Sequence, residues 1–485
     1  MAKNLLESYK NRLSLSEAVY QKSHNGARMS NSKKLLIATV LNNTSKFVNE
    51  AFDSSAATQR SALGEFKKFC LNISTVALPN LILPELMLTH PMTSMTGYVT
   101  YLKYQLGATK GDAKQGTMVN SVYRHGEMDE ARVNYTSDRI VETVKAGEVS
   151  LAWAPVVEDA FKDADGKDQA VKFFPADGTD ASFLTVTDGK VTAPADGKIA
   201  YVYNNVIIPQ NQVDVAKTYA SIPTLTAKME GITLVAHARR IAVYYSQIAA
   251  FQAKTDYGYD LAEQLSAQAQ GELAYEIDTE GVLMLEKGAE EEKELTFKSY
   301  ELDAASATTY ISRSQYYEQF SEIIARAKKV IYQRTQKFAP NYMVVGANIV
   351  TILPYLKGWT AAPASAVNGP YFAGTIDGLK VFVSPSIDEN KYFFGVNGSD
   401  LQTSAAVYAP YMAIVPTQLL GFADGGNSQG FSTLYDMKLL STYNKEGDKV
   451  VEPKEGESGD FSWLLVAGKF ITDEKDLPAD EVTEG

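Results

Sequence analysis

The chain has 485 residues, of which 45% are hydrophobic and 21% are charged, an ordinary composition for globular domains that allows a large core. At about 150 residues per domain, this length suggests roughly three units. The net charge is −12. Residues 1–65 carry +4, from nine Lys or Arg and five Asp or Glu, so the remainder carries −16. An acidic body argues against a nucleic-acid-binding surface, because phosphate contacts need clustered Lys and Arg.

The cysteine count and the hydropathy pattern exclude a disulfide-bonded protein and a membrane-spanning one. The single cysteine, Cys70, excludes an internal disulfide and is typical of a reducing cytoplasm. No stretch approaches the roughly 18 consecutive apolar residues of a membrane span, so none is expected. The 28 tyrosines suit extensive protein–protein contact, because tyrosine combines apolar area with a polar tip.

Residues 1–65 are expected to form a segment that is separable from the rest. SNSKKLLIATVLNNTSKFVNEAF (30–52) begins with Ser and Asn, which are common capping residues, and its apolar residues have the spacing of an amphipathic helix. The small polar residues 53–62 are typical of a linker.

The next stretch predicts a strand followed by a long loop. GYVTYLKYQL (97–106) has the alternating pattern of a strand, in which successive side chains point to opposite faces. Residues 107–139 are polar, contain glycine and have little to bury, so we expect a projecting loop. The strand residues expected on one face are Tyr98, Thr100, Leu102 and Tyr104.

Residues 155–222 contain four Asp-Gly pairs, which are favoured where a tight hairpin turn needs positive φ. Short β-prone pieces lie between the pairs. This pattern predicts a small all-β module inserted into a larger domain. The pairs are Asp165–Gly166, Asp177–Gly178, Asp188–Gly189 and Asp196–Gly197.

Two helices are expected in the second half of the chain. A strand or strand pair at 224–245 precedes the strongest helix, 258–288, in which apolar residues repeat every four positions from Leu261 to Ile277. A second helix over about 312–336 begins with Ser312 and Gln315 in the spacing of a capping box. Pieces rich in β-forming residues follow from 342 to 443, and a last strand is expected at 461–471.

No catalytic constellation emerges from the motifs. Gly426–Gly430 matches G-x-S-x-G, but the hydrolase elbow needs a later His and all four histidines come earlier, so a turn is favoured. A calcium loop starting at Asp163 would need Gly and Glu where Asp168 and Phe174 stand. The chain has no CxxC, HExxH or P-loop. We therefore predict no enzyme activity, no cofactor and no metal site.

A long helix, a projecting loop and an inserted β module expose much surface unless neighbours cover it, which suggests a subunit of an assembly. The chain resembles the major capsid proteins of tailed bacteriophages, in the T-even-like group with the Hong Kong 97-type fold. The stretches that carry the resemblance are LPNLI (78–82), HPMTSMTGYVTYLKYQLG (90–107), VYAPYMAIVP (407–416) and GFSTLYDM (430–437), with weaker similarity in 31–41 and 226–288. Their family-like residues are Pro79, Asn80, Pro91, Gly97, Tyr408, Pro410, Tyr411, Gly430 and Phe431.

The resemblance implies an α+β fold of the Hong Kong 97 type. In that fold a peripheral domain carries a long spine helix, an axial domain meets its symmetry mates, and an extended loop lies over a neighbour. The implied ranges are 1–65 for the N-terminal segment, 66–106 for the arm and first peripheral strand, 107–154 for the extended loop, 155–222 for the inserted all-β domain, 223–339 for the peripheral domain with spine helix 258–288, 340–442 for the axial domain, and 443–485 for a return strand with an acidic tail.

The resemblance also implies maturation cleavage after Glu65, in a context that Leu63 fits. However, only 12 residues separate Glu65 from LPNLI, where the family has a longer arm. Cleavage and retention of the N-terminal segment therefore both stay open.

The function implied is a structural shell protein that self-assembles as hexamers and pentamers into an icosahedral head around double-stranded DNA, without sequence-specific binding. The implied location is the virion capsid after assembly in the host cytoplasm, with scaffold, portal, vertex and decoration proteins as partners and no membrane. Candidate inter-subunit contacts are Arg124, Glu127, Arg132, Arg239 and Arg240, and a solvated strand edge is the alternative for the last two.

Two other functions stay open. A pentameric vertex protein of the same fold would share these motifs. A carbohydrate-binding or carbohydrate-acting protein is suggested by the aromatic residues of the β module, although a glycosidase needs a pair of carboxylates that no motif singles out.

Overall fold

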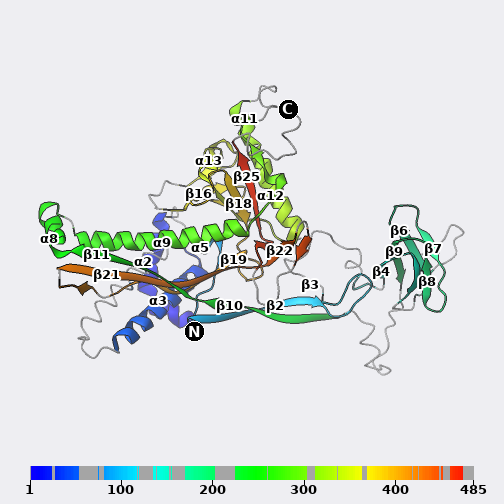
Figure 1. Cartoon of the computed structure of the whole chain (residues 1–485), viewed down its shortest axis with the longest axis horizontal. Coiled ribbons are helices and arrows are strands. Elements are labelled where there is room, and N and C mark those ends of the chain that lie inside the picture. The colour runs from blue at the N-terminus through cyan, green and yellow to red at the C-terminus, as the bar shows by residue number, and fades with distance from the viewer. Residues whose placement is uncertain are drawn as a thin grey trace. The chain divides into compact units, whose positions relative to one another are not determined.

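A computed structural model describes residues 2–23, 28–53, 71, 75, 81–116, 118–119, 135–137, 139–151, 155, 170–202, 224–258, 260–302, 312–335, 337–362, 369–417, 419–423, 425–446, 449–451 and 459–472. The chain divides into two compact units. Unit 1 contains residues 1–99 and 231–485, and unit 2 contains residues 100–230. Helices and mixed sheets together make the fold α+β (Figure 1).

The first sheet of unit 1 joins strands that lie far apart in the sequence. Its order is β1-β19-β21-β11, with β20 also beside β21. β1 runs parallel to β19, and the other neighbours are antiparallel. The register of β19 shifts between Pro410 and Met412, where proline has no N–H to donate to the ladder. The strands are β1 (Leu88–Thr89), β11 (His237–Ser246), β19 (Ala406–Pro416), β20 (Leu420–Gly421) and β21 (Gly426–Leu439).

Helices cover both faces of this sheet. In β21, Phe431 and Leu434 are three residues apart and therefore point to opposite faces. Helix α9 (Leu261–Gly288) packs on the Phe431 side, and helix α3 (Asn31–Asp53) packs Val48 on the Leu434 side. Figure 1 shows α9 running along β11 and β21. The sheet is thus the middle layer of a helix–sheet–helix arrangement.

The expected helices are present with adjusted ends. The helix expected at 258–288 begins at Leu261, because Gly258 has a positive φ of 73° and Asp260 caps the backbone N–H groups of Ala262 and Glu263. The Ser312–Gln315 capping box is confirmed, but the helix behind it is divided. The remaining helices are α1 (Ala2–Ser8), α2 (Lys10–Ser23), α5 (Leu83–Leu86), α8 (Gln247–Asp256), η1 (Lys293–Leu295), α11 (Arg313–Glu318), α12 (Phe320–Thr335), α13 (Ala347–Val350) and η2 (Leu353–Tyr355).

The second sheet of unit 1 has the order β12-β25-β18-β14-β17-β16-β15, and β13 also pairs with β25. β14 is fully buried between a parallel and an antiparallel neighbour, as its unbroken apolar sequence YMVV predicts. The strands are β12 (Glu290–Glu291), β13 (Phe297–Lys298), β14 (Tyr342–Val345), β15 (Thr360–Ala361), β16 (Tyr371–Ile376), β17 (Leu379–Val383), β18 (Lys391–Gly395) and β25 (Leu465–Ile471).

The two sheets do not follow the ranges that the resemblance implied. The range 340–442 is divided, because β14 to β18 belong to the second sheet whereas β19 and β21 pair with β11. The last strand, β25, pairs with β18 and not with β11. Strand pairing joins residues that can be far apart in sequence, so a continuous range need not form a single sheet. A smaller sheet has the order β23-β22-β24, from β22 (Thr442–Glu446), β23 (Lys449–Val451) and β24 (Phe461–Ser462).

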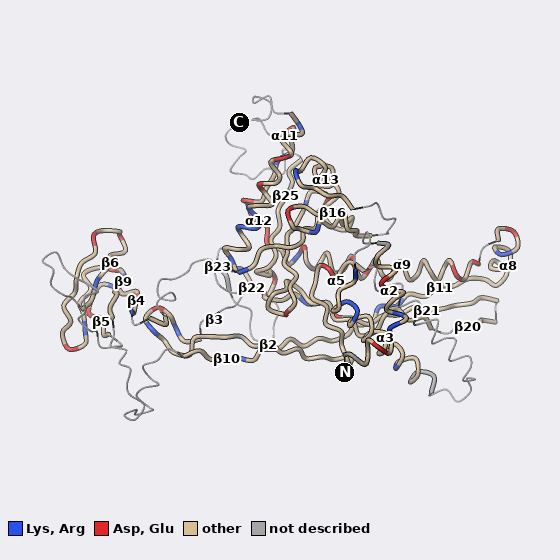
Figure 2. Tube along the Cα trace, turned by 180° about the vertical axis from the view of Figure 1, so that it is seen from behind, with Lys and Arg blue, Asp and Glu red and all other residues tan. Residues whose placement is uncertain are grey.

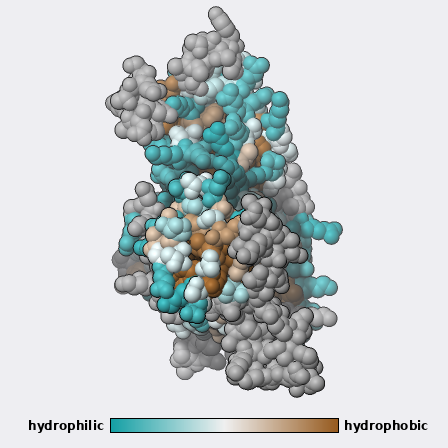
Figure 3. Space-filling model, turned by 90° about the vertical axis from the view of Figure 1, so that its right-hand side faces the viewer, coloured by the Kyte–Doolittle hydropathy of each residue, from teal (hydrophilic) through white to brown (hydrophobic). Residues whose placement is uncertain are grey.

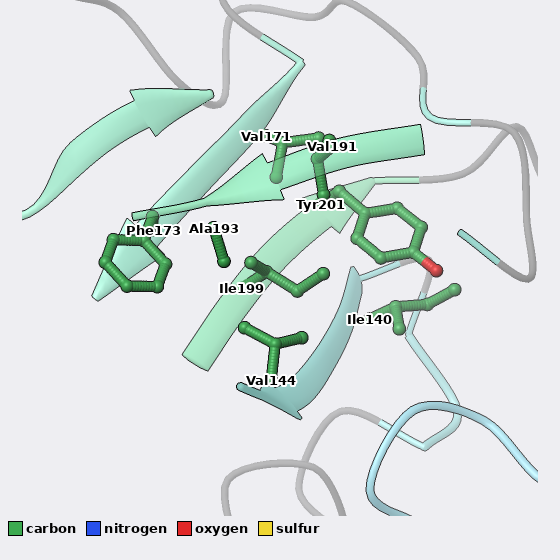
Figure 4. Packing of buried hydrophobic residues seen from close by; sticks show 8 residues of the cluster. All are labelled: Ile140, Val144, Val171, Phe173, Val191, Ala193, Ile199 and Tyr201. Carbon is green, nitrogen blue, oxygen red and sulfur yellow. The ribbon is translucent and has the colours of Figure 1, made fainter. Parts of the chain in front are cut away.

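Unit 2 has its own β core. A four-stranded sheet has the order β4-β9-β6-β7, and β5 pairs with β8. Figure 4 shows the side chains that pack between these strands, including Phe173, Ile199 and Tyr201. Strands β4 and β5 lie in the range 107–154, for which an extended loop was expected. The apolar pattern that could have indicated β4 is short, since it rests on Ile140 and Val144. The strands are β4 (Arg139–Val144), β5 (Gly147–Ser150), β6 (Val171–Pro175), β7 (Ser182–Leu184), β8 (Lys190–Ala193) and β9 (Gly197–Val202).

The Asp-Gly pairs of unit 2 occur at turns, but in different ways. Asp188 and Gly189 both have positive φ, 50° and 73°, and Thr187 and Lys190 exchange two backbone hydrogen bonds around them, as in a type I′ hairpin. Gly178 also has a positive φ of 77°, whereas Gly197 begins β9. Asp165–Gly166 lies outside the described residues.

A third sheet has the order β10-β2-β3, and the chain passes from one unit to the other within β2 and again within β10. The strand expected at 97–106 is confirmed as β2, and Tyr98, Leu102 and Tyr104 are exposed on it. Gly231 lies directly under the ring of Tyr98, where a Cβ would come within 2.2 Å of the ring. The strands are β2 (Thr96–Leu106), β3 (Met118–Val119) and β10 (Leu225–Val235).

Candidate functional site

Three of the four family-like stretches, 90–107, 407–416 and 430–437, meet at the first sheet of unit 1. Tyr408 and Pro410 of β19 pair with Met437 and Tyr435 of β21. The carbonyl oxygen of Tyr408 accepts a hydrogen bond of 2.9 Å from the backbone N–H of His90. Residues more than 300 positions apart therefore lie side by side, and we call this junction of β1, β19 and β21 the motif junction.

The stretch that follows β1 continues the junction. Next to Pro91, the backbone N–H of Met92 donates to the carbonyl oxygen of Pro410 at 3.0 Å. Gly97 is the second residue of β2, and a Cβ there would be 3.4 Å from the methyl carbon of Met92. The chain therefore passes from the first sheet into β2 within a few residues. Little space is left beside Met92 for a side chain at position 97.

Tyrosines on the α9 side of the junction are held by a carboxylate. The Tyr408 and Tyr435 rings lie 6.0 Å apart, and the Tyr435 hydroxyl donates to Oε2 of Glu280 at 2.5 Å. Burial and then the hydrogen bond to Glu280 raise the pKa of Tyr435 above its ordinary value, so the phenol stays neutral. Phe431 packs beside these residues against Leu273.

Four arginines were predicted to contact other subunits, and of the two that the structure describes, Arg239 is bound within the chain. Its guanidinium forms an ion pair with Glu280, and Tyr435 and Glu280 together raise its pKa. Arg240 is exposed on the opposite face of β11 and forms no ion pair with the described residues. Arg239 therefore has a charged partner within unit 1, whereas Arg240 has none among the described residues.

Tyr411 and Gly430 make backbone contacts in the same sheet. The Tyr411 carbonyl accepts a hydrogen bond of 2.9 Å from the side-chain amide of Asn43. The backbone N–H of Gly430 donates to Oγ1 of Thr417 at 2.8 Å, and a Cβ on Gly430 would lie 3.2 Å from that oxygen. Glycine thus allows this close turn from β19 into β20 and β21.

Seven predicted residues lie outside the described part of the chain. They are Leu63 and Glu65 of the cleavage context, Pro79 and Asn80 of the entry motif, and Arg124, Glu127 and Arg132 of the loop.

Sequence reasoning missed several buried polar residues that hold the junction. Asp278 of α9 is buried, and its Oδ1 accepts hydrogen bonds from the backbone N–H groups of Ile82 at 3.1 Å and Leu83 at 3.3 Å. Asn43 of α3 donates to the carbonyl of Met92 at 2.7 Å. The sequence did contain a signal for these residues, because each is a polar residue inside the apolar stripe of a predicted helix. A polar residue in such a position is buried only when it is hydrogen-bonded, so it indicates a specific partner.

The motif read as a turn is a strand. Gly426–Gly430 begins β21 and pairs with β11, with Ser428 opposite Tyr244. A strand in mid-sheet cannot form the strand–turn–helix elbow of a hydrolase. No group of three or more His, Cys, Asp or Glu that could hold a metal occurs among the described residues. None of the described helices is long and apolar enough to cross a membrane.

Helix α12 of unit 1 carries four basic residues and one acidic residue, Glu322. The Lys and Arg along α12 can be followed in Figure 2. Arg326 forms an ion pair with Glu322 one turn away, and Lys329 forms one with Glu294. This helix is therefore basic, unlike the chain as a whole, although carboxylates pair with Arg326 and Lys329.

Large apolar side chains reach the surface where β11 passes into α8. Phe251 of α8 is 71% exposed, and such a short helix has little stability of its own in water. Figure 3 faces the side of the molecule away from α8, and it shows a separate group of hydrophobic side chains among hydrophilic ones. We call the following exposed residues the α8 patch: Tyr244, Ile248, Phe251, Tyr257, Leu420 and Phe422.

The family of major capsid protein Gp23 matches residues 63–461, which include the motif junction, α9, the first sheet and the strands of the second sheet other than β25. The chain belongs to this family. The Gp23 family is a structural family of bacteriophage capsid proteins, so the chain is a component of the virion capsid. Among curated proteins, none matches the sequence.

Solved structures give distant similarities to this Gp23-family chain. A chain from Mycobacterium phage Bobi is 9% identical, with a TM-score of 0.35, and the alignment covers 81% of this chain and 90% of that one. A chain from Microbacterium phage Oxtober96 is 11% identical, with a TM-score of 0.34 and coverage of 81% and 91%. A chain of the capsid of Myoviridae phage XM1 is 9% identical, with a TM-score of 0.32 and coverage of 51% and 78%. The family assignment rests on the Gp23 match alone.

Proposed function

We propose that this chain is the subunit that self-assembles into capsomers, hexamers and pentamers, which close into an icosahedral phage head around double-stranded DNA. The observation that carries the proposal is the Gp23 family match across residues 63–461. The finer fold proposed is of the Hong Kong 97 type, with α9 as its spine helix and the β strands of unit 2 as an inserted domain.

The surface of unit 1 supports self-association. Large exposed apolar patches mark interaction sites in proteins that are stable in water. The α8 patch is such a surface, and a shell offers each copy the same neighbour many times over. Several modest interfaces per subunit then add through avidity.

The finer roles remain part of the same proposal. Arg124, Glu127 and Arg132 would contact a neighbouring subunit, as would Arg240, and cleavage would follow Glu65. Scaffold, portal, vertex and decoration proteins would be the partners during assembly in the host cytoplasm. The net charge of −12 suits a container that must not bind its DNA tightly.

Electron microscopy of the purified protein, combined with light scattering, tests the proposal. We expect capsomers or closed shells, either alone or with a scaffold protein from the same phage. Protein that stays monomeric at high concentration in both conditions would contradict it. Density found only at five-fold positions of the native particle would instead identify a vertex protein.

A further inference from the structure

A buried ammonium group lies between the N-terminal helices and the rest of unit 1. Lys33, near the start of α3, has only 7% of its side chain exposed. Its Nζ lies 3.7 Å from Oε1 of Glu85 and 4.3 Å from the centre of the Tyr20 ring. It has no hydrogen-bond partner among the described residues. A buried ammonium normally donates three hydrogen bonds, so this one is poorly compensated.

Other groups compete with Lys33 for the oxygens of Glu85, which lies too far from Lys33 for a hydrogen bond. The Tyr20 hydroxyl donates to Oε1 at 2.7 Å, and Nζ of Lys380 lies 3.1 Å from Oε2. Asp278 is the second carboxylate near Lys33, and its oxygens accept from backbone N–H groups. The cluster thus holds two cations, Lys33 and Lys380, and two carboxylates, Glu85 and Asp278. Of these four groups, only Lys33 is attracted to opposite charges without forming a hydrogen bond. Removing such a charge from water costs more than this attraction returns.

The N-terminal helices bind the sheet through side chains. Val48 packs on Met412 and Val415, and Asn43 donates to the carbonyl oxygens of Met92 and Tyr411. Within the described residues, no backbone-to-backbone hydrogen bond joins residues 2–53 to the strands. The strands themselves are joined by continuous ladders. The helices can therefore separate from the sheet without breaking any strand pair.

We propose that helices α1 to α3 form a docked segment that detaches from the first sheet before the rest of unit 1 unfolds, and that the ammonium of Lys33 sets how readily it detaches. Detachment returns Lys33 to water and uncovers the apolar side chains of Met412, Val415 and Leu434. The segment would thus act as a reversible cover for one face of the sheet. This inference does not depend on the proposed shell function.

The pH dependence of docking has a definite sign. Burial lowers the pKa of Lys33 to about 8 in the docked state, whereas a detached Lys33 has its ordinary value of 10.5. Between these values the detached state binds more protons, so docking strengthens as the pH rises from about 8. The other charged groups facing Lys33 are Glu85 and Lys380, and burial raises the pKa of Tyr20 above this window. Burial raises the pKa of Asp278 to about 7, so Asp278 titrates below the window.

Hydrogen exchange of the full chain, measured by mass spectrometry, tests the proposal. Protection factors of α3 amides (31–53) are compared with those of β18 amides (391–395), after correction for the intrinsic exchange rate. We expect α3 to exchange faster than β18 in the unaltered chain. The change Lys33→Met should raise α3 protection about tenfold or more, which corresponds to one unit of pKa shift, and leave β18 unchanged. The increase in α3 protection between about pH 8 and about pH 9.5 should vanish in this variant.

The matched control is Lys34→Met, because Lys34 is the neighbouring lysine and forms a partly exposed pair with Glu17 at 2.9 Å. It should change α3 protection by less than about threefold, as expected of an exposed ion pair. Two results would overturn the proposal. One is α3 and β18 exchanging with a common protection factor, which means that no separate detachment occurs. The other is unchanged or lower α3 protection in Lys33→Met, which means that the ammonium does not weaken docking.

Discussion

The carboxylate of Asp278 accepts hydrogen bonds from the backbone N–H of Ile82, 196 positions earlier in the chain, and from that of Leu83 beside it. These N–H groups begin α5 and have no partner within that helix, so Asp278 caps α5 from the side of α9. This contact fixes the segment that leads into the motif junction. Its loss is expected to destabilise unit 1 more than the loss of any exposed carboxylate on α9.

We therefore expect Asp278→Ala to reduce the free energy of unfolding by about 2 kcal/mol, because it leaves two buried N–H groups unpaired. Asp278→Asn retains an acceptor oxygen and should cost less at pH 8. The measurement is urea unfolding followed by circular dichroism. Glu276→Ala, an exposed position on the same helix, is the control and should change stability by less than about 0.5 kcal/mol.

The same residue should set part of the pH dependence of stability. Burial raises the pKa of Asp278 from 3.8 to about 7, so the folded chain binds more protons than the unfolded chain between these values. Stability contributed by this group therefore falls as the pH rises from about 4 to about 7. The slope of melting temperature against pH should be less negative in Asp278→Asn. Parallel curves for the two proteins would contradict the assignment.

Two glycines of α9 should respond in opposite ways to the same substitution. A Cβ on Gly281 would lie 2.2 Å from a methyl carbon of Leu83, whereas a Cβ on Gly271 would meet nothing within 4 Å. Gly281→Ala should destabilise unit 1 by about 1–3 kcal/mol through overpacking. Gly271→Ala should stabilise it by up to about 1 kcal/mol, because alanine favours the helix. Equal effects in calorimetry would show that helix propensity, and not the contact with α5, decides both.

Arg334 connects α12 to the second sheet through two carboxylates. Its guanidinium donates to Glu290 at 2.6 Å and also bonds Glu292, and its side chain is 13% exposed. Arg334→Ala should cost about 3 kcal/mol, because it leaves buried carboxylate charge with less compensation. Arg326→Ala removes an exposed pair with Glu322 on the same helix and should cost less than about 0.5 kcal/mol. Chemical denaturation of both variants under the same conditions makes the comparison.

The α8 patch predicts a variant that folds but does not assemble. Phe251→Asp places a charge on a side chain that is 71% exposed, so the melting temperature should remain close to that of the unaltered chain. Burying that charge in a contact between subunits would be costly, so shells or capsomers should be lost from electron micrographs. Lys254→Gln in the same helix is the control and should assemble. Normal assembly of Phe251→Asp would remove the patch from the set of subunit contacts.

Local elements were predictable because their causes lie within a few residues. The capping box of Ser312 and Gln315 and the hairpin turn at Asp188–Gly189 follow from side chains and φ preferences that neighbours in sequence supply. The long helix was predictable from its apolar repeat, although Gly258 and Asp260 moved its start. The stretch Gly426–Gly430 was read as a turn for the same local reason, and its pairing with β11 overrode that preference.

The sequence by itself determined the acidic composition, the principal helices, the β-rich module and the order of motifs that indicated a capsid family. Only the tertiary structure decided which strands share a sheet, that Arg239 is bound by Glu280, and that Asp278 and Lys33 are buried beside α5. The reason is physical. Helix and turn preferences act between residues that are near in sequence, whereas strand pairing and the burial of charge depend on residues hundreds of positions apart that meet only when the chain has folded.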